Sequence, residues 1–434
     1  MKVLIVTHFY APEAAPRAFR WTAIAEHWAR EGATVHVITT GRGVRPVLEN
    51  RNGVIVHGIG EELLGKLQRR TGAGGVSASR ENRGAKSKRL LPQRMAKAIY
   101  NATWRHVFWP DYACLWYWPA QTVAKDLCRA ESFDAVITVS HPFTGHLVGL
   151  SLKRALPSLR WITDVGDPFS LADTVASNNQ WLYRKLNRRV EAAVLNECDE
   201  ISVTVAGCAT VLADIFKAKV AKFHVIPPLL SLPDSADRDA TSDFAGRDTI
   251  DLVYLGVLYP GLRAPDGLLA LFAAMYAKNN ALRLHFFGDL KGCEEAFERY
   301  RDLLGTAVHL YGPISRAEVA ATMAAADVLV NIGNATAHQL PSKLVEYVAA
   351  KRPILNIARS TQDTATTFLR HHPAALSLML ENSTPGEGQI DRALDFVRTS
   401  PAIETAEWHR LIEPFQLPAV ASAIAELVCG NREG

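Results

Sequence analysis

Short apolar runs alternate with helix-like segments along most of this chain, and this alternation constrains the fold more than any other feature. The run MKVLIVTHF is followed by a helical segment with Trp21, Ile24 and Trp28 on one face, and ATVHVITT is the next run. Strand, helix and strand in this order form a βαβ unit, whose parallel strands are buried on both faces. Further strands are predicted at 54–58, 135–139, 160–164, 200–205 and 222–226. Residues 1–230 are therefore predicted to form one Rossmann-like, doubly wound lobe.

A polar stretch separates this lobe from a second one. Residues 231–248 are rich in turn formers and contain little that a core would bury, so they are predicted to be a linker. The alternation then restarts with the runs DLVYLG, LRLHFFGD, AVHLYG, DVLVNIG and RPILNIA. The predicted class is α/β: two Rossmann-like lobes facing a central cleft, the second at 249–400, with a helical segment at 401–434 crossing back over the lobes.

The segment HQLPSKLVEYVAAKRPIL, residues 338–355, places a cation and a carboxylate at one predicted helix start. Ser342 is a candidate N-cap, and the helix N-terminus together with Lys343 would attract a phosphate. Glu346, one turn later, has the acceptor oxygens that ribose hydroxyls require. A nucleoside diphosphate would satisfy both features. An equally good alternative is that Glu346 only complements the helix dipole and that Lys343 is a solvated surface residue.

Other candidate ligand residues follow predicted strands, where open α/β sheets bind ligands. Gly256 ends a strand in LGVLYPGLRAP and would let a phosphate approach the backbone, and Arg263 would supply a bidentate guanidinium. An ordinary tight turn and a solvated arginine are the alternatives. His141 follows the VITV strand, where it would either donate a hydrogen bond to a sugar or phosphate or serve a structural role.

Asp164 and Asp167 lie three residues apart in TDVGDPF and do not form a DxD motif, so no divalent metal is expected there. We expect at least one of them to order the loop, with acceptor binding or base chemistry as the alternative. The motifs GxGxxG, GxxxxGK[ST], HExxH and GxSxG do not occur in the sequence. Their absence disfavours dehydrogenases, P-loop enzymes, zinc proteases and α/β-hydrolases.

A basic window precedes an aromatic one. Between Lys66 and Lys97 there are ten Lys or Arg residues and one acid, Glu81, although the whole chain carries a net charge of only +4. The aromatic residues that follow are Tyr100, Trp104, Phe108, Trp109, Tyr112, Trp116, Tyr117 and Trp118. We expect peripheral contact with an anionic membrane through 66–118 rather than nucleic-acid binding, which uses a similar composition. The alternative is a solvated insertion followed by core aromatics.

The six cysteines indicate a reducing compartment. They form no CxxC pair and have no partnered histidine spacing, so neither zinc nor a disulfide framework is expected. No uninterrupted apolar stretch reaches the roughly 18 residues that span a bilayer. We therefore expect a cytoplasmic protein, located at the inner face of the membrane if it contacts one.

Several of these segments resemble one family. MKVLIVTHFYAPE, REGATVHVIT, WITDVGDPFS, LVYLGVLYPGLRAPDGLLAL and QLPSKLVEYVAAKRPIL are similar, in order, to segments of GT-B glycosyltransferases of family 4, which are retaining nucleotide-sugar transferases. The resemblance implies sugar transfer from a nucleoside diphosphate sugar as co-substrate, with no metal and no other cofactor. By position, Arg263 and Lys343 would hold the diphosphate, Glu346 the ribose and the backbone near Ile314 the base. His141 would contact the sugar or phosphate.

Two departures from the family pattern concern donor handling. Position 338, where the family has the first carboxylate of a Glu-x7-Glu motif, is His338, so the donor-sugar contact would fall to His338 and Gln339. The first loop usually carries glycines and here reads Ala14-Ala15-Pro16, followed by Arg17. Arg17 is grouped with Asp164 and Asp167 on the acceptor side. These changes predict either an altered sugar specificity or a loss of activity.

The leading hypothesis is a transferase that acts on a lipid-linked or polysaccharide acceptor in polysaccharide biosynthesis. A nucleotide-sugar epimerase or hydrolase would keep the same donor site. A degenerate, non-catalytic sugar-binding subunit is the third possibility, which His338 makes reasonable.

Overall fold

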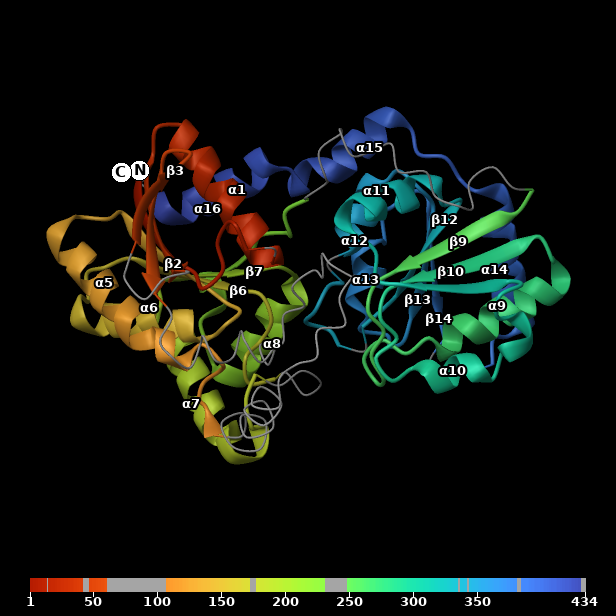
Figure 1. The fold of residues 1–434 in the computed structure, drawn as a ribbon, viewed down its shortest axis with the longest axis horizontal. Coiled ribbons are helices and arrows are strands. Elements are labelled where there is room, and N and C mark those ends of the chain that lie inside the picture. The colour runs from red at the N-terminus through yellow and green to blue at the C-terminus, as the bar shows by residue number, and fades with distance from the viewer. Residues whose placement is uncertain are drawn as a thin grey trace, which may run out of the picture. The chain divides into compact units, whose positions relative to one another are not determined.

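A computed structural model describes residues 1–13, 15–41, 47–60, 107–171, 177–230, 248–334, 336–341, 343–380 and 384–430 (Figure 1). The chain divides into two compact units, one formed by Met1–Leu229 with Leu417–Gly434 and the other by Leu230–Gln416. Each unit contains one mainly parallel sheet with helices on both faces, which confirms the predicted fold class of two α/β lobes. Residues 231–247 of the linker expected at 231–248, and the basic window at 66–97, lie outside the described residues.

The first lobe has an eight-stranded sheet in the order β3-β4-β2-β1-β5-β6-β7-β8. All neighbouring strands are parallel except β3 and β4. The strands are β1 (Lys2–Val6), β2 (Thr34–Gly41), β3 (Val47–Arg51), β4 (Val54–Gly60), β5 (Ala135–Val139), β6 (Trp161–Val165), β7 (Glu200–Val203) and β8 (Phe223–Val225). Strand β3, VLENR, was not predicted because it is an exposed antiparallel edge strand with no apolar run.

Alternate residues of β1 enter two different cores, as the two-residue period of a strand requires. Val3 and Ile5 pack with helices α1 (Pro16–Arg30) and α16 (Leu417–Cys429). Leu4 and Val6 pack with α5 (Tyr117–Ala130) and α6 (Thr144–Ala155). A third core lies under α7 (Gln180–Glu197) and α8 (Ala206–Phe216). The short 3₁₀ helices are η1 (Cys114–Trp116) and η2 (Val220–Lys222). The central strand is thus buried on both faces, which explains its continuous apolar sequence.

The second lobe has a six-stranded parallel sheet in the order β11-β10-β9-β12-β13-β14. The strands are β9 (Ile250–Leu255), β10 (Leu282–Phe287), β11 (Val308–Gly312), β12 (Val328–Ile332), β13 (Ile354–Ala358) and β14 (Ala375–Met379). Strand β14 was missed by the sequence analysis; it is a half-buried edge strand whose apolar run is interrupted by Ser377. The helices are α9 (Asp266–Lys278), α10 (Glu294–Glu298), α11 (Arg316–Ala325), α12 (Lys343–Ala349), α13 (Thr364–Phe368), α14 (Glu387–Thr399), α15 (Thr405–Ile412), η4 (Arg301–Leu303) and η5 (Glu413–Phe415).

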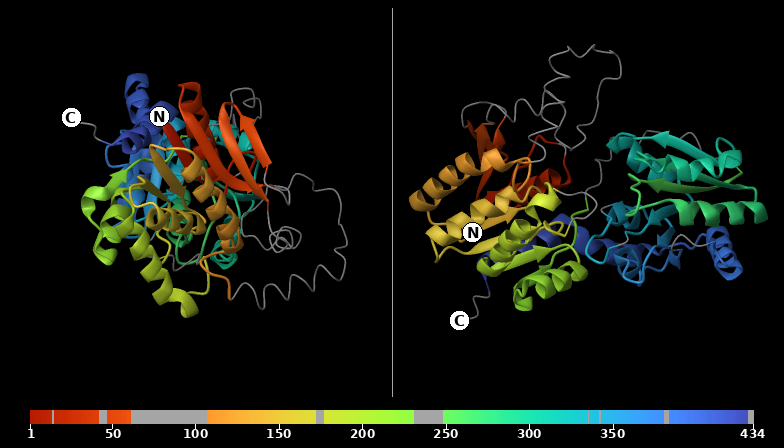
Figure 2. Two further views of the ribbon diagram at one scale, coloured as in Figure 1. Left: turned by 90° about the vertical axis from the view of Figure 1, so that its left-hand side faces the viewer. Right: turned by 90° about the horizontal axis from the view of Figure 1, so that it is seen from below.

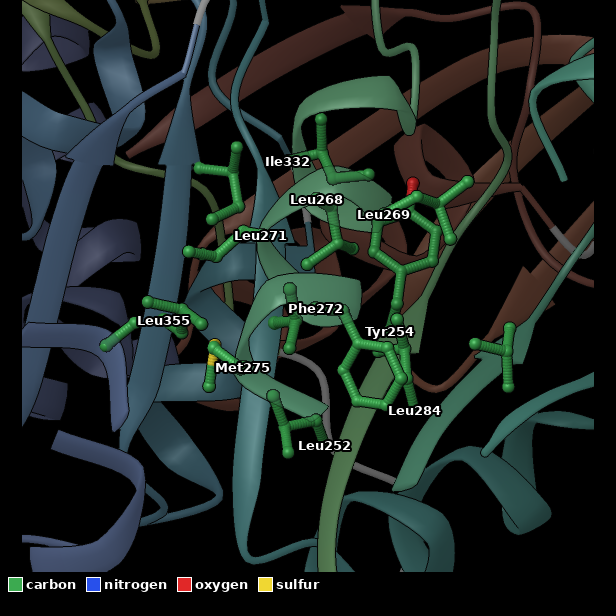
Figure 3. Packing of buried hydrophobic residues seen from close by; sticks show 14 of the residues in the cluster. Leu252, Tyr254, Leu268, Leu269, Leu271, Phe272, Met275, Leu284, Ile332 and Leu355 are labelled. Atoms are coloured by element: carbon green, nitrogen blue, oxygen red, sulfur yellow. The ribbon is translucent and has the colours of Figure 1, made fainter. Parts of the chain in front are cut away.

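One face of this sheet carries a large apolar core built around α9. Figure 3 shows Leu268, Leu271 and Phe272 of α9 over Leu252 and Tyr254 of β9. The opposite face is covered by α11 and α12, whose residues share a second core with the alternate residues of β9. The strand ends are therefore held rigidly by packing on both sides, which positions the loops that follow them.

The C-terminal segment contributes to both units. Helix α15 packs on α12 within the second lobe, and α16 packs on α1 within the first, where Trp28 Nε1 donates to the carbonyl of Ala421 at 3.2 Å. Helix α16, in blue, accordingly lies among the red to yellow-green elements of the first lobe (Figures 1 and 2). Within the described residues, Thr405–Cys429 is the one segment long and apolar enough to cross a membrane. Its residues Val420 and Ile424 are buried in the core of the first lobe, so that apolar surface is used inside the protein.

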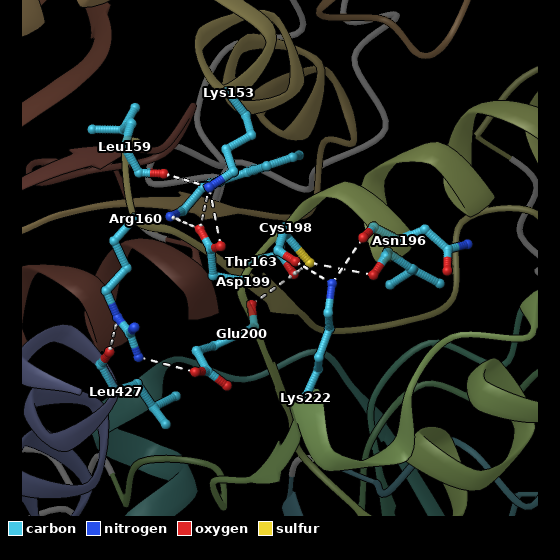
Figure 4. A network of polar contacts seen from close by, with 12 residues as sticks. Lys153, Leu159, Arg160, Thr163, Asn196, Cys198, Asp199, Glu200, Lys222 and Leu427 are labelled. Carbon is cyan, nitrogen blue, oxygen red and sulfur yellow. Dashed lines mark hydrogen bonds and ion pairs between the residues drawn. The ribbon is translucent and has the colours of Figure 1, made fainter. Parts of the chain in front are cut away.

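A polar network fastens the amino ends of β6 and β7, the edge opposite the carboxyl ends of these strands (Figure 4). Lys153 Nζ donates to Asp199 Oδ2 at 2.8 Å and to the carbonyl of Leu159 at 2.7 Å. Arg160 donates to Glu200 Oε1 at 2.9 Å and to the carbonyl of Leu427 in α16 at 2.8 Å. The network joins α6, β6, β7 and α16 at the amino edge of the sheet and includes no residue of the carboxyl edge.

Candidate active site

Four neighbouring strands of the second lobe end at or just before a glycine. These residues are Gly256 after β9, Gly288 after β10, Gly312 at the end of β11 and Gly333 after β12. Gly288 has a φ of +143°, and a Cβ atom there would overlap the carbonyl oxygen of Gly256. A Cβ atom at Gly333 would overlap the carboxylate of Asp363. At Gly288 and Gly333 only glycine fits, because neighbouring groups occupy the place of a side chain. The phosphate approach at Gly256 stays a prediction.

Arg263 points to the neighbouring strand end rather than into open solvent. Its Nε and Nη2 both donate to Asn334 Oδ1, each at 3.0 Å, and its backbone pairs with Tyr259 in the loop after β9. The side chain is half-buried. The guanidinium is consequently fixed at the carboxyl edge, and the hypothesis of a solvated arginine does not fit this geometry.

Asn334 is a site residue that sequence reasoning missed. It is buried, and its Nδ2 donates to the carbonyl of Gln339 at 3.1 Å, so it joins Arg263 to the loop that precedes α12. Thr364 Oγ1 donates to the same carbonyl at 2.6 Å. The available signal was its position directly after Gly333 at the end of β12, at the edge where Arg263 was already expected.

A buried polar network holds the loop that follows β12. Asn331 Nδ2 donates to Asn356 Oδ1 at 2.6 Å, and Asn356 Nδ2 donates to Asp363 Oδ2 at 3.1 Å. Asp363 in turn caps α13 through the backbone of Thr366 at 2.9 Å. Because buried polar groups that all have partners define one geometry, the network fixes Gly333 and the residue that follows it.

Lys343 and Glu346 lie together at the start of α12, as predicted, but they contact each other. Lys343 Nζ lies 2.9 Å from Glu346 Oε2, and the side chains are 35% and 23% exposed. Ser342, the predicted N-cap, lies outside the described residues. The two groups are accessible, and a ligand that carries both phosphate and hydroxyl groups would replace one partner for each.

Tyr347 attaches α12 to the end of β9. Its hydroxyl accepts from the backbone N–H of Leu255 at 2.8 Å and donates to the carbonyl of the same residue at 3.3 Å. Burial raises the pKa of this hydroxyl far above its usual range, so it remains protonated. The start of α12 is thereby held beside the strand end that carries Gly256.

The predicted base and sugar positions lie in loops at the same edge. Ile314 is half-buried against the core under α11, directly before Ser315, which forms the capping box with Glu318 that the sequence indicates. His338 is half-buried in the loop before α12. Tyr311, near the end of β11, stacks on Phe287 with ring centroids 4.3 Å apart and is a second residue that sequence reasoning missed. Its aromatic position at a strand end was the available signal.

In the first lobe, His141 directly follows Ser140 at the end of β5 and is exposed. Its ring centroid lies 5.7 Å from that of Tyr112, and Tyr112 lies 5.7 Å from His8, which follows β1. The buried carboxylate of Asp111 accepts from Thr144 Oγ1 at 2.7 Å and thereby ties this segment to the start of α6. His8 was missed, although it has the same relation to its strand as His141, and Tyr112 was expected only as part of the aromatic window for membrane contact.

Asp164 has a positioning role rather than the acceptor-side role that was the alternative. It is 1% exposed, and its carboxylate accepts from Arg17 at 2.7 Å, Trp21 at 2.9 Å and Ser202 at 3.0 Å. Burial alone would raise its pKa, but the positive charges of Arg17 and Arg20 and these hydrogen bonds hold the pKa below its usual range. No oxygen of Asp164 is left to face an acceptor.

Arg17 is held over Gly166, because a Cβ atom at that glycine would overlap Arg17 Nη2. Its guanidinium is therefore committed to Asp164 and to the loop after β6, while Asp167 in the same loop is exposed. An acceptor role for Asp167 stays a prediction. Among the residues that the structure describes, no three His, Cys, Asp or Glu side chains gather as a metal site would require.

Comparison with known proteins gives a fold and no closer relationship. No protein-family model matches the sequence, and no curated protein sequence matches it. Sucrose-phosphate synthase from Thermosynechococcus elongatus is similar in structure, with 15% identity, 98% of each chain covered and a TM-score of 0.62. HepE from Anabaena, solved in complex with UDP and glucose, has 13% identity, 98% of each chain covered and a TM-score of 0.59. WaaG, a glycosyltransferase involved in lipopolysaccharide biosynthesis, has 12% identity, covers 99% of this chain and 100% of its own, and has a TM-score of 0.55.

These similarities extend over both lobes and define the fold as that of GT-B glycosyltransferases. The predicted resemblance is confirmed at the level of the fold. The assignment to family 4 stays a prediction.

Proposed function

We propose that the protein transfers a sugar from a nucleoside diphosphate sugar to a lipid-linked or polysaccharide acceptor, with retention of the anomeric configuration. The observation that carries the proposal is the carboxyl edge of the second lobe. There, glycine-lined backbone, the fixed guanidinium of Arg263 and the accessible pair Lys343–Glu346 lie on neighbouring elements. This combination suits a diphosphate joined to a ribose. The similar protein HepE was solved with UDP and glucose, which supports the same class of donor.

The proposed roles follow from the charges. Sugar transfer leaves a nucleoside diphosphate whose negative charge grows as the glycosidic bond breaks, and fixed cations stabilise that charge. In this proposal Arg263 and Lys343 supply those cations, and no metal is required. When the diphosphate attracts Lys343, Glu346 is released to accept hydrogen bonds from the ribose. The backbone near Ile314 would contact the base, and Tyr311 adds an aromatic ring at that edge.

His141 would contribute from the first lobe. It is exposed after β5 and backed by the ring of Tyr112, so its imidazole is available to the donor sugar or phosphate. His338 and Gln339 would face the sugar itself, and the Gln339 carbonyl already holds Asn334. We place the protein in the cytoplasm, at the inner face of the membrane, where a lipid-linked acceptor would be found.

The donor half of the proposal is tested by calorimetric titration of UDP, GDP and ADP, followed by their sugars. We expect one nucleoside diphosphate to bind wild type and Glu346→Ala to weaken that binding. The matched control is Glu387→Ala, which breaks an exposed pair with Lys278 at 2.5 Å in the same lobe. No binding of any nucleoside diphosphate to wild type would remove the proposal.

The transfer half is tested by the products. Nuclear magnetic resonance of the product anomer distinguishes retention from inversion. Release of free sugar or of an epimer without any acceptor would instead support the hydrolase or epimerase alternative, which uses the same donor site.

The presence of His338 favours one further candidate, a sugar-binding subunit without turnover. In that case wild type would bind the sugar nucleotide but leave it intact with every acceptor fraction. His338→Glu restores the carboxylate of the resembling family, and recovery of turnover in that variant alone would support this candidate.

A further inference from the structure

Exposed apolar side chains gather on the outer face of the first half of α7. Trp181 is 91% exposed, and Leu182 and Leu186 are 50% and 41% exposed. The two leucines are four residues apart and therefore adjacent on the helix surface. Contiguous exposed apolar surface of this kind usually marks an interaction site, since its exposure to water is unfavourable.

Four cations share this face. Arg184, Lys185, Arg188 and Arg189 are all exposed, and residues 180–190 contain no acid. Trp181, Lys185 and Arg189 follow each other at intervals of four residues, so they form a row beside the row of leucines. We call the seven residues Trp181, Leu182, Arg184, Lys185, Leu186, Arg188 and Arg189 the docking face.

The first acid of α7, Glu191, is turned inward, and Arg188 is the one cation of this face that interacts electrostatically with it. The carboxylate of Glu191 is buried and accepts from the backbone N–H groups of Phe169 at 2.7 Å and Ser170 at 2.9 Å. Asn187 is also buried on this inner side, where it accepts from Trp109 Nε1 at 3.0 Å. The helix is thus anchored by its inner face and presents basic and apolar residues outward.

An exposed apolar residue, Val107, also lies against α7. Tyr183 donates its hydroxyl to the carbonyl of Val107 at 2.6 Å, and Val107 is itself exposed. Apolar side chains among four cations suit the interface of an anionic bilayer, where acyl chains meet the apolar groups and anionic headgroups meet the cations.

We propose that the docking face binds the first lobe to an anionic lipid bilayer. Trp181, Leu182 and Leu186 enter the interface between headgroups and acyl chains, and the four cations contact anionic headgroups. The proposal goes beyond the proposed function because it assigns membrane contact to α7, and it is measured without any sugar nucleotide. Its outcome is therefore independent of whether the protein transfers a sugar.

The test is flotation of the full-length protein with vesicles of phosphatidylcholine alone or mixed with phosphatidylglycerol. We expect wild type to float with the anionic vesicles and to be released by salt, because exposed charge pairs are screened. The double reversal K185E/R189E changes the charge of the face by four, and we expect it to reduce binding at least about tenfold. We expect W181S/L182S to reduce binding about tenfold through lost apolar burial.

The matched control is R392E/R398E, which makes the same charge change on two exposed residues of α14 in the second lobe. We expect this variant to bind like wild type. Circular dichroism and thermal unfolding of all variants show whether each is folded, so a loss of binding can be assigned to the surface.

Three outcomes would overturn the proposal. The first is equal flotation of wild type with neutral and anionic vesicles, or none with either. The second is α7 variants that bind as well as the control variant. The third is a different occupant of the face: K185E/R189E abolishing capture of a single-stranded RNA probe while vesicle binding persists, or W181S/L182S converting a dimer to a monomer in sedimentation.

Discussion

The carboxyl edges of the two sheets are built in opposite ways. In the first lobe the carboxylate of Asp164 is buried and accepts from Arg17, Trp21 and Ser202, and Arg17 is half-buried against it. In the second lobe Arg263, Lys343 and Glu346 are partly exposed, and glycines leave the strand ends without side chains. Charged residues at the two carboxyl edges therefore differ: Asp164 and Arg17 hold the loops of the first edge, whereas Lys343 and Glu346 of the second edge are accessible to solvent.

The largest expected effect comes from a substitution at the carboxyl edge of the first lobe. Asp164→Ala leaves the guanidinium of Arg17 without its buried partner and Arg20 without a nearby counter-charge, which should destabilise the first lobe by about 3–5 kcal/mol. Eight of the nine tryptophans, all except Trp408, belong to this lobe, so urea unfolding followed by tryptophan fluorescence reports on it. The control is Asp167→Ala, an exposed residue of the same loop, expected within about 0.5 kcal/mol of wild type. Equal effects of the two substitutions would contradict the positioning role of Asp164.

The second prediction concerns ligand binding at the carboxyl edge of the second lobe, in a variant that stays folded. Arg263→Ala removes a fixed guanidinium from the proposed diphosphate site, and we expect a loss of about 2 kcal/mol in binding, roughly thirtyfold in the dissociation constant. Isothermal titration with the nucleoside diphosphate that wild type prefers measures the loss. Arg392→Ala, which removes an exposed arginine of α14 in the same lobe, serves as control. An unchanged dissociation constant for Arg263→Ala would show that the diphosphate binds elsewhere.

A third prediction uses pH to test a buried histidine of the first lobe. Burial lowers the pKa of His146, in α6, to about 3. In the folded protein this imidazole therefore stays neutral, whereas in the unfolded chain it binds a proton below about pH 6.5. The contribution of His146 to the free energy of unfolding is fully present above pH 6.5 and is lost as the pH falls toward 3. Between pH 6.5 and 5 the loss is about 2 kcal/mol. His146→Gln should flatten that part of the pH profile of urea unfolding, and a profile as steep as that of wild type would contradict it.

The smallest expected effect distinguishes the roles of Lys343 and Glu346 at the carboxyl edge of the second lobe. Glu346→Gln should weaken binding of a nucleoside diphosphate by about 1 kcal/mol, roughly fivefold, because the ribose loses a charged acceptor. Binding of inorganic pyrophosphate should not weaken, since Lys343 loses only its resting partner. Titration of both ligands against both proteins provides the internal control. A parallel loss for pyrophosphate would mean that Glu346 acts through Lys343 and not on the ribose.

The sequence predicted the central strands of both lobes well because those strands are buried on both faces and read as continuous apolar runs. It missed β3 and β14, which lie at sheet edges and have only partial burial. For the site, it placed Arg263, Lys343 and Glu346 on the correct elements, since strand ends and helix starts are local signals. It did not foresee Asn334 as the partner of Arg263, because their contact joins residues 71 positions apart. The contact between Lys343 and Glu346 depends on side-chain direction, which residue spacing alone does not fix.

The division of the chain has a consequence for the order in which the protein is made. The second lobe consists of one continuous stretch, Leu230–Gln416, whereas the core of the first lobe includes Val420 and Ile424 of α16. A ribosome releases those residues only after the whole of the second lobe. The first lobe therefore completes its core only after the second lobe has been synthesised and has had the opportunity to fold.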